Sequence, residues 1–326
     1  MRLNKLLSPL AGAAMAALLS MPIVSSAASK YPSMPIRFVI GFSPGGSTDI
    51  IGRVLAKRMS EILGQPIVVE NRAGADSLIA TQFVAQAQND GYTLLVASGS
   101  HSINPTLYPD SKIDPVKDFA AIGLIGSSPN FLVVHPSVPA QSATQLIELA
   151  KANPGKYNSA TSASTTFLAT ELFKKMAGIN TTSIPYKGAG PATLALLSGE
   201  VQYSITSLTG MLTHVQSGKA RALAVTSAQR SPLAPDVPTV DERAVPGYVA
   251  STWYGMFAPA GTPADILQRL SASLHESMDD PEVRKQLEGQ GMQLTKDTPE
   301  EFTEFVREDT AKWAQVIRES NAQVAK

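Results

Sequence analysis

The stretch that most constrains the fold of this chain runs from residue 38 to residue 49 and reads FVIGFSPGGSTD. Its apolar start is typical of a buried strand, and its end passes directly into a segment whose apolar residues recur every three to four positions, as in an amphipathic helix. A strand that leads through a Gly/Ser loop into a helix presents free backbone N–H groups and the positive end of the helix dipole. This pattern predicts an anion-binding site at residues 43–49.

The first 28 residues have the composition of a secretory signal peptide. Arg2 and Lys5 precede an apolar run from residue 6 to about residue 19, and small residues at 25–28 provide a cleavage site. The run is too short and too rich in small residues for a membrane span, and no other stretch of about 18 apolar residues occurs. We expect an exported chain whose mature form is soluble.

Composition excludes several classes of function. The chain has no cysteine, which excludes disulfides, thiolate metal sites and cysteine nucleophiles. It has 27 basic and 27 acidic residues, and loss of Arg2 and Lys5 with the signal peptide leaves a net charge of about −2. Aromatic residues make up 6% and no basic stripe is present, so nucleic acid is not an expected partner. The remaining length of about 300 residues favours two domains.

Apolar strands alternate with helical segments, which is typical of an α/β fold built from parallel βαβ units. Strands are predicted at 36–42, 66–70, 92–97, 131–135, 157–161, 183–188, 201–207, 220–226 and 253–257. Helices are predicted at 49–63, 78–87, 142–152, 167–177, 191–197, 263–278, 281–288 and 299–322. The proline-rich run 231–246 is interpreted as a linker.

The strand, small polar loop and helix of the opening stretch recur once, at residues 157–177. Here the loop at 162–166 consists mainly of hydroxyl residues, and both helices carry two basic residues followed by methionine. Two such units favour two similar lobes, each directing a helix N-terminus at a shared cleft beyond the carboxyl ends of the strands. Chance similarity between small-residue loops is the alternative explanation.

Several blocks of this sequence resemble the periplasmic solute-binding receptors of tripartite tricarboxylate transporters, the Bug proteins. In order, they are YPSMPIRFVIGFSPGGSTDIIGR, IVVENRAGA, NDGYTLLVAS with INPTLY after it, IPYKGAGPATLALLSGEV, SGKARALAV, APDVPTVDE and WYGMFAPAGTPADIL. Each block alone is a weak signal, whereas their combination behind a signal peptide is specific. The resemblance extends over nearly the whole mature chain.

The resemblance implies a two-lobed Venus-flytrap fold in the periplasm, with each lobe a mixed or mostly parallel sheet flanked by helices. Residues 1–28 would be the signal peptide, 29–128 and 253–326 the first lobe, and 129–252 the second. A small mono-, di- or tricarboxylate, possibly aromatic, would bind between the lobes of a monomer and be delivered to membrane transporter subunits. No cofactor, metal or catalytic residue is implied. The candidate ligand-binding residues are Phe42, Ser43, Gly45, Gly46, Ser47, Thr48, Asp49, Ala75, Ser98, Ser100, His101, Ser162, Ser164, Thr165, Thr166, Tyr186 and Thr206.

Some of these residues have an equally good structural interpretation. The glycines can serve a tight turn, Asp49 can favour the start of its helix, and Tyr186 can be a half-buried aromatic. The chain also departs from the family pattern, since Ala75-Asp76-Ser77 replaces a Gly-rich run and Thr206 stands where an Asp is usual. One acidic group is thereby gained and one lost. The sequence therefore does not predict which chemical group the ligand carries at the end opposite its carboxylate.

Two other functions are compatible with the sequence. A sensor subunit would have the same cleft but would dock on a signalling protein, and only its outer faces would differ. A hydrolase is less expected, because no P-loop, dinucleotide fingerprint or zinc-type histidine pair occurs. Catalytic triads are recognised by geometry, so the absence of a motif does not exclude one.

Overall fold

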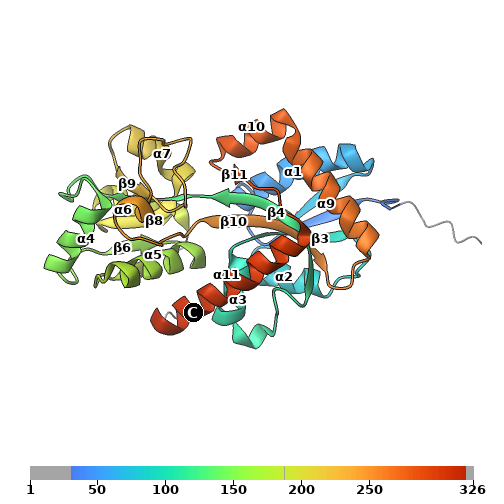
Figure 1. Ribbon diagram of the computed structural model, residues 1–326, viewed down its shortest axis with the longest axis horizontal. Helices are drawn as coiled ribbons and strands as arrows, with labels where there is room; N and C mark the ends of the chain where they lie inside the picture. The colour runs from blue at the N-terminus through green and yellow to red at the C-terminus, as the bar shows by residue number, and fades with distance from the viewer. Residues whose placement is uncertain (1–30, 187, 321–326) are drawn as a thin grey trace, which may run out of the picture.

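The structure, a computed structural model, describes residues 31–186 and 188–320. Two mixed β-sheets form the centres of two lobes that lie side by side (Figure 1). Helices cover both faces of each sheet, so each lobe is a three-layer α/β/α unit. The predicted two-lobed periplasmic-binding-protein fold is confirmed. Within the described residues, no helix combines the length and apolar character needed to cross a membrane.

The sheet of lobe 1 has six strands in the order β11-β4-β10-β3-β1-β2 among the described residues. Their bounds are Ile36–Ile40 (β1), Ile67–Asn71 (β2), Thr93–Ser98 (β3), Phe119–Ser128 (β4), Thr252–Pro259 (β10) and Gln293–Leu294 (β11). The first three are parallel, as the βαβ pattern predicts, whereas β10 runs antiparallel between β3 and β4. The carboxyl ends of β1, β2 and β3 therefore lie at one edge of the sheet.

Two hydrophobic clusters attach the helices of lobe 1 to its sheet. One face packs against α1 (Ser47–Leu63), α9 (Ala264–Asp279) and α10 (Pro281–Gly289), and the other against α2 (Leu78–Ala85) and α11 (Pro299–Ser320). The sequence predicts a core stripe of Ile51, Leu55, Met59 and Ile62 in α1; the first three are buried, whereas Ile62 is partly exposed. The helix ends at Gly64, whose φ is 71°.

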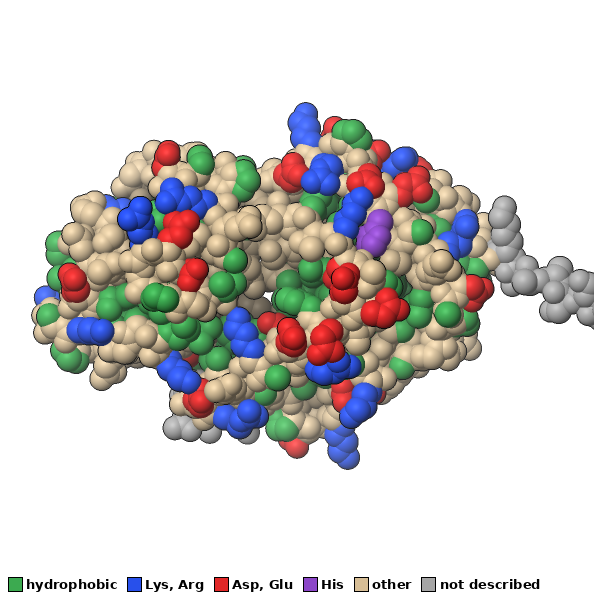
Figure 2. All heavy atoms as spheres, in the orientation of Figure 1, with side chains coloured by type: hydrophobic (Ala, Val, Ile, Leu, Met, Phe, Trp, Pro, Cys, Tyr) green, Lys and Arg blue, Asp and Glu red, His purple; other side chains and the backbone are tan. Residues whose placement is uncertain are grey.

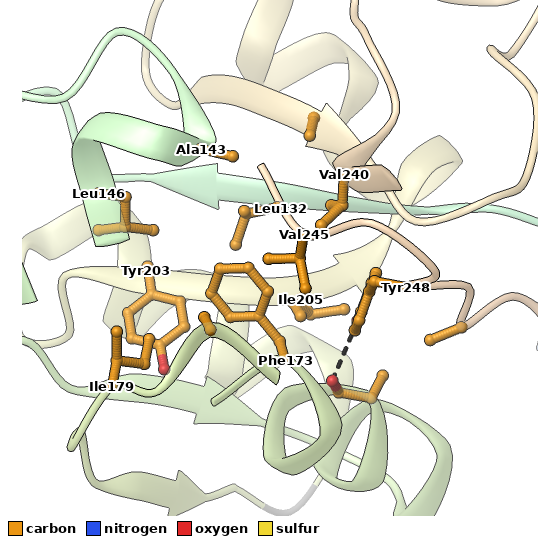
Figure 3. Close-up of a cluster of buried hydrophobic side chains, with 14 of the residues drawn as sticks. Leu132, Ala143, Leu146, Phe173, Ile179, Tyr203, Ile205, Val240, Val245 and Tyr248 are labelled. Atoms are coloured by element: carbon orange, nitrogen blue, oxygen red, sulfur yellow. Dashed lines mark hydrogen bonds between the residues drawn. The ribbon is translucent and has the colours of Figure 1, made fainter. Parts of the chain in front are cut away.

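The sheet of lobe 2 has the order β7-β6-β8-β5-β9. Its strands are Asn130–Val134 (β5), Ser159–Thr161 (β6), Ser183–Pro185 (β7), Tyr203–Ser207 (β8) and Arg221–Val225 (β9). Strands β6, β7 and β8 are parallel and end at the same edge. The covering helices are α4 (Ala143–Ala152), α5 (Ser164–Ala177), α6 (Ala189–Ser198), α7 (Leu208–Gln216) and α8 (Val240–Arg243). Figure 3 shows the core between α4, α5 and the sheet, where Tyr248 donates to the carbonyl of Ala169 at 3.0 Å.

The lobes are joined by two chain crossings and by two helices. Only Pro129 separates β4 of lobe 1 from β5 of lobe 2, and the chain returns through residues 226–251 into β10. Helix α11 is fixed to β10 where Trp253 Nε1 donates to Asp309 Oδ2 at 2.8 Å, while Trp313 of the same helix packs in the core of lobe 2. Ile103 of α3 (Ser100–Leu107) belongs to that core as well. These contacts hold the two lobes at a defined junction.

Several elements differ from the sequence prediction. The predicted loop at 162–166 is too long, because α5 already begins at Ser164. Pro191 is the third residue of α6 and not the first, since the helix begins at Ala189 after Gly188. The predicted linker contains the short helix α8, whose start is capped by the Thr239 hydroxyl. Strand β4 and helices α3 and α7 have no counterpart in the prediction.

Candidate functional site

Residues 43–49, called here the lobe 1 loop, follow β1 at the carboxyl edge of its sheet. Residues 43–47 are exposed, whereas Thr48 and Asp49 are buried. Gly45 has a φ of +84°, a conformation that glycine adopts without steric cost. Gly46 precedes the first residue of α1 and has no side chain that could accept a hydrogen bond at the helix start. The positive end of α1 is therefore directed at an exposed, glycine-containing loop.

The carboxylate of Asp49 holds the lobe 1 loop in place. It accepts hydrogen bonds from the backbone N–H of Gly45 at 2.9 Å, from Asn71 Nδ2 at 2.8 Å and from Arg53 Nε at 2.9 Å. Asn71 Nδ2 also donates to the carbonyl of Phe42 at 3.0 Å. The bond from Arg53 is the largest of the effects that lower the pKa of Asp49 to about 2. The acidic group and the nearby arginine thus neutralise each other, and the loop relies on backbone dipoles to attract an anion.

Residues 162–166, called the lobe 2 loop, are the corresponding feature of the second lobe. They follow β6, and α5 begins within them after Ala163, which cannot cap the helix with a side chain. Thr166 Oγ1 accepts from the backbone N–H groups of Ser162 and Ala163, each at 3.2 Å. Ser162, Ser164 and Thr165 are partly exposed. Both lobes therefore present an uncapped helix start at the carboxyl edge of a parallel strand.

The two loops approach one another through the segment after β2. Ser164 Oγ of lobe 2 donates to Asp76 Oδ2 of lobe 1. Ser77 packs onto Gly41, two residues before the lobe 1 loop, and Thr165 Cγ2 lies 3.6 Å from the Cβ position of Gly99 in lobe 1. Figure 2 shows the surface hollowed between the lobes. The helix starts of α1 and α5 are therefore brought to the junction where a cleft would close.

The residues after β3 lie deeper than the sequence suggests. Ser98 and Ser100 are buried, and their hydroxyl groups form a hydrogen bond of 3.1 Å. The ring of His101 is 2% exposed, stacks on Phe257 with centroids 4.5 Å apart, and donates through Nε2 to the carbonyl of Pro115 at 3.0 Å. Burial lowers the pKa of His101 to about 4. This arrangement gives His101 a place in the aromatic core beneath the cleft.

The remaining candidates lie at the edges of the same region. Tyr186 follows β7 and donates to Glu200 Oε1 at 2.7 Å; burial and this bond raise its pKa to about 12. Thr206 is 8% exposed in β8, opposite Phe131. Phe42 is half-buried, and Ala75 is exposed. Among the described residues, no group of three or more His, Asp or Glu side chains could hold a metal ion.

The candidate ligand-binding residues predicted from the sequence did not include three residues that shape this region. Asn71 and Arg53 support Asp49, and Asp76 reaches the other lobe. Asp76 stands out in the sequence only as a departure from a Gly-rich run, which does not reveal where its side chain lies. The signal for Arg53 is clearer, because it stands four residues after Asp49 on a predicted helix.

Comparison with known proteins agrees with this geometry. Residues 51–322 match the family described as tripartite tricarboxylate transporter family receptor. The chain belongs to this receptor family. Protein BugT of Bordetella pertussis is 38% identical over 301 residues, which cover 91% of this chain and 92% of BugT. The predicted resemblance to Bug proteins is therefore confirmed, and the family is one of solute-binding receptors.

Solved structures of similar proteins share the fold of this receptor. A Rhodopseudomonas palustris protein with adipate is 34% identical with a TM-score of 0.80, and the match covers 90% of this chain and all of that one. MatC from the same species, with bound malate, is 30% identical with a TM-score of 0.76 over 88% of this chain and all of MatC. The periplasmic binding protein BugD is 33% identical with a TM-score of 0.77 over 90% of this chain and 99% of BugD.

Proposed function

We propose that this protein captures a small organic carboxylate between its two lobes in the periplasm and delivers it to a tripartite membrane transporter. One observation carries the proposal: α1 and α5 both begin at the junction of the lobes, and neither helix N-terminus is capped by a side chain. A carboxylate accepts hydrogen bonds from such N–H groups and is stabilised by both helix dipoles. The related proteins solved with adipate and malate support a carboxylate ligand.

The proposed binding surface combines the lobe 1 loop with the lobe 2 loop. Gly45, Gly46 and Ser47 are exposed in the first, and Ser164 and Thr165 are accessible in the second. Neutral N–H and O–H donors bind an anion without the desolvation cost of burying an arginine. In this proposal Asp49 and His101 act as supports, because the carboxylate of Asp49 and Nε2 of His101 already have protein partners.

The proposed mechanism is ligand-linked closure of the lobes. A carboxylate first docks on the lobe 1 loop, and lobe 2 then rotates so that the lobe 2 loop completes the contacts. The ligand favours the closed form only to the extent that it binds this form more tightly than the open one. Export through the N-terminal signal peptide, residues 1–28, is part of the proposal; this segment lies outside the described residues.

A thermal-shift screen tests the binding step. Mature protein, residues 29–326, is refolded to remove bound ligand and is melted with mono-, di- and tricarboxylates, amino acids and aromatic acids. A ligand at 100 times its dissociation constant stabilises the fold by about 2.7 kcal/mol, which raises the melting temperature by several degrees. A rise with one class of carboxylate supports the proposal. A flat response to every anion contradicts it.

Delivery to a transporter needs a separate test. Cells that lack this protein should lose uptake of the radiolabelled carboxylate that binds, and the mature sequence with its signal peptide should restore uptake. Uptake that continues at the original rate without the protein would favour the sensor function over transport.

A further inference from the structure

Asp76 lies in an unusual turn between the two proposed binding loops. Ala75, Asp76 and Ser77 have φ values of 45°, 51° and 78°, although none of them is glycine. Each such residue costs about 1–2 kcal/mol in the left-handed region. Distant segments hold the turn, since Ser77 packs against Gly41 and Asn104 Nδ2 donates to the carbonyl of Asp76 at 2.8 Å. The chain thus fixes the backbone of Asp76 in a strained conformation.

The side chain of Asp76 spans the junction of the lobes. Its Oδ2 accepts a hydrogen bond from the hydroxyl of Ser164, the first residue of α5. Asp76 itself follows β2 and is one residue from Ser77, which contacts the segment that leads into the lobe 1 loop. The carboxylate of Asp76, from lobe 1, therefore lies at the N-terminus of α5, which is the anion-binding feature of lobe 2.

This carboxylate has no cationic partner in the part of the chain that the structure describes. No lysine or arginine of residues 31–186 and 188–320 forms an ion pair with Asp76, and Ser164 supplies the one hydrogen bond found there to its side chain. Burial raises the pKa of Asp76, and burial together with the charge of Asp76 raises the pKa of Tyr108 nearby. Partly buried carboxylates are ordinarily paired with a cation or with several donors. Asp76 lacks such a partner.

We propose that Asp76 determines ligand specificity, by favouring a carboxylate that carries a protonated amine over one with a second carboxylate at the same distance. The proposal rests on the proposed receptor function and names the class of ligand for that cleft. The lobe 1 loop at the start of α1 binds the ligand's carboxylate, whereas Asp76 already occupies the start of α5 through Ser164. The full negative charge of Asp76 exceeds the partial positive charge of about one half at that helix start, so an ammonium group of the ligand pairs with Asp76. A dicarboxylate would instead bring two like charges together in a site with few compensating groups.

Titration calorimetry with length-matched probes tests this. The pairs are succinate and 3-aminopropanoate, glutarate and 4-aminobutyrate, and adipate and 5-aminovalerate. In each pair the backbone length is equal and an ammonium group replaces one carboxylate. Refolded wild-type protein is compared with Asp76→Asn, which keeps the size of the side chain and suits a left-handed residue. Asp265→Asn is the matched control, because it removes the same charge from an exposed position in α9.

In the wild type and in Asp265→Asn, the amino member of at least one pair should bind at least tenfold more tightly than its dicarboxylate. In Asp76→Asn this ratio should fall at least tenfold, with an unchanged melting temperature showing that the fold is intact. A wild type that prefers dicarboxylates, or a ratio in Asp76→Asn within threefold of the wild type, would overturn the inference while leaving a carboxylate receptor in place. Failure of all three pairs to bind would also overturn it, and the wider screen would then decide the receptor function by itself.

Discussion

Ser77 packs against Gly41 so closely that a Cβ on residue 41 would lie 1.9 Å from Ser77 Oγ and 2.6 Å from Ser77 Cα. This contact joins the turn after β2 to the segment that follows β1. It therefore fixes the position of Asp76 relative to the lobe 1 loop, although the two lie far apart in the sequence.

Gly41→Ala should destabilise the protein, because the added methyl group meets backbone as well as side-chain atoms of Ser77. Overpacking of this kind costs about 1–3 kcal/mol, which urea unfolding at neutral pH would measure. Gly289→Ala is the control, since nothing lies within 4 Å of its Cβ position in α10 and alanine favours a helix. Equal stability of the two variants would show that the contact between Gly41 and Ser77 is not tight in solution.

Gly46→Ala should weaken carboxylate binding without affecting the fold. Residue 46 has φ −77° and ψ 165°, which alanine adopts freely, and the nearest atom to its Cβ position is the carbonyl oxygen of Ser43 at 3.6 Å. We expect affinity for the best carboxylate of the screen to fall at least tenfold at an unchanged melting temperature. Gly45→Ala, at φ +84°, should instead melt at a lower temperature. Normal binding by Gly46→Ala would remove this glycine from the proposed ligand site.

Asp49→Asn should destabilise lobe 1 by about 1–2 kcal/mol, because the bonds from Gly45, Asn71 and Arg53 lose their charged acceptor. The pKa of Asp49 is lowered to about 2, so the ionised form stabilises the fold above about pH 4, and this contribution is lost as the pH falls toward 2. The difference in urea stability between wild type and variant should therefore be present at pH 7 and shrink near pH 2. A constant difference would contradict this role of the charge.

The buried His101 should give the stability of the fold a second dependence on pH, at milder acidity. Burial lowers the pKa of His101 to about 4, so between about pH 6.5 and pH 4 the unfolded chain takes up a proton that the folded protein does not. Stability should fall over this window by on the order of 3 kcal/mol. His101→Phe preserves an aromatic ring against Phe257 and should remove this part of the slope, while it loses the bond to Pro115. An identical slope in wild type and variant would show that His101 titrates normally.

The sequence predicts those parts of the fold whose signals are local. Strand β1 and helix α1 are found because their apolar residues follow regular periods and Gly64 ends the helix. Helix α3 is missed because SHSINPTL has little apolar periodicity and contains Pro105. His101 is expected at the cleft edge because it follows a strand, yet the chain turns at Gly99 and buries the ring against Phe257. Tertiary contacts decide such positions.

The candidate site likewise has a part that local sequence signals predict and a part that tertiary contacts decide. The strand, loop and helix units of both lobes are visible in the sequence, so the two loops could be predicted as a pair. The role of Asp76 could not, because its left-handed backbone depends on Gly41 and Asn104 from other segments. The sequence Ala75-Asp76-Ser77 does not predict three consecutive residues with positive φ, because none of them is glycine.

Closure of the two lobes around a carboxylate is the central claim, and small-angle X-ray scattering measures it most directly. Refolded mature protein is measured alone and with a saturating amount of the carboxylate that gives the largest thermal shift. We predict a smaller radius of gyration in the presence of this ligand, because lobe 2 rotates toward lobe 1. A bound carboxylate that leaves the radius of gyration unchanged would contradict ligand-linked closure.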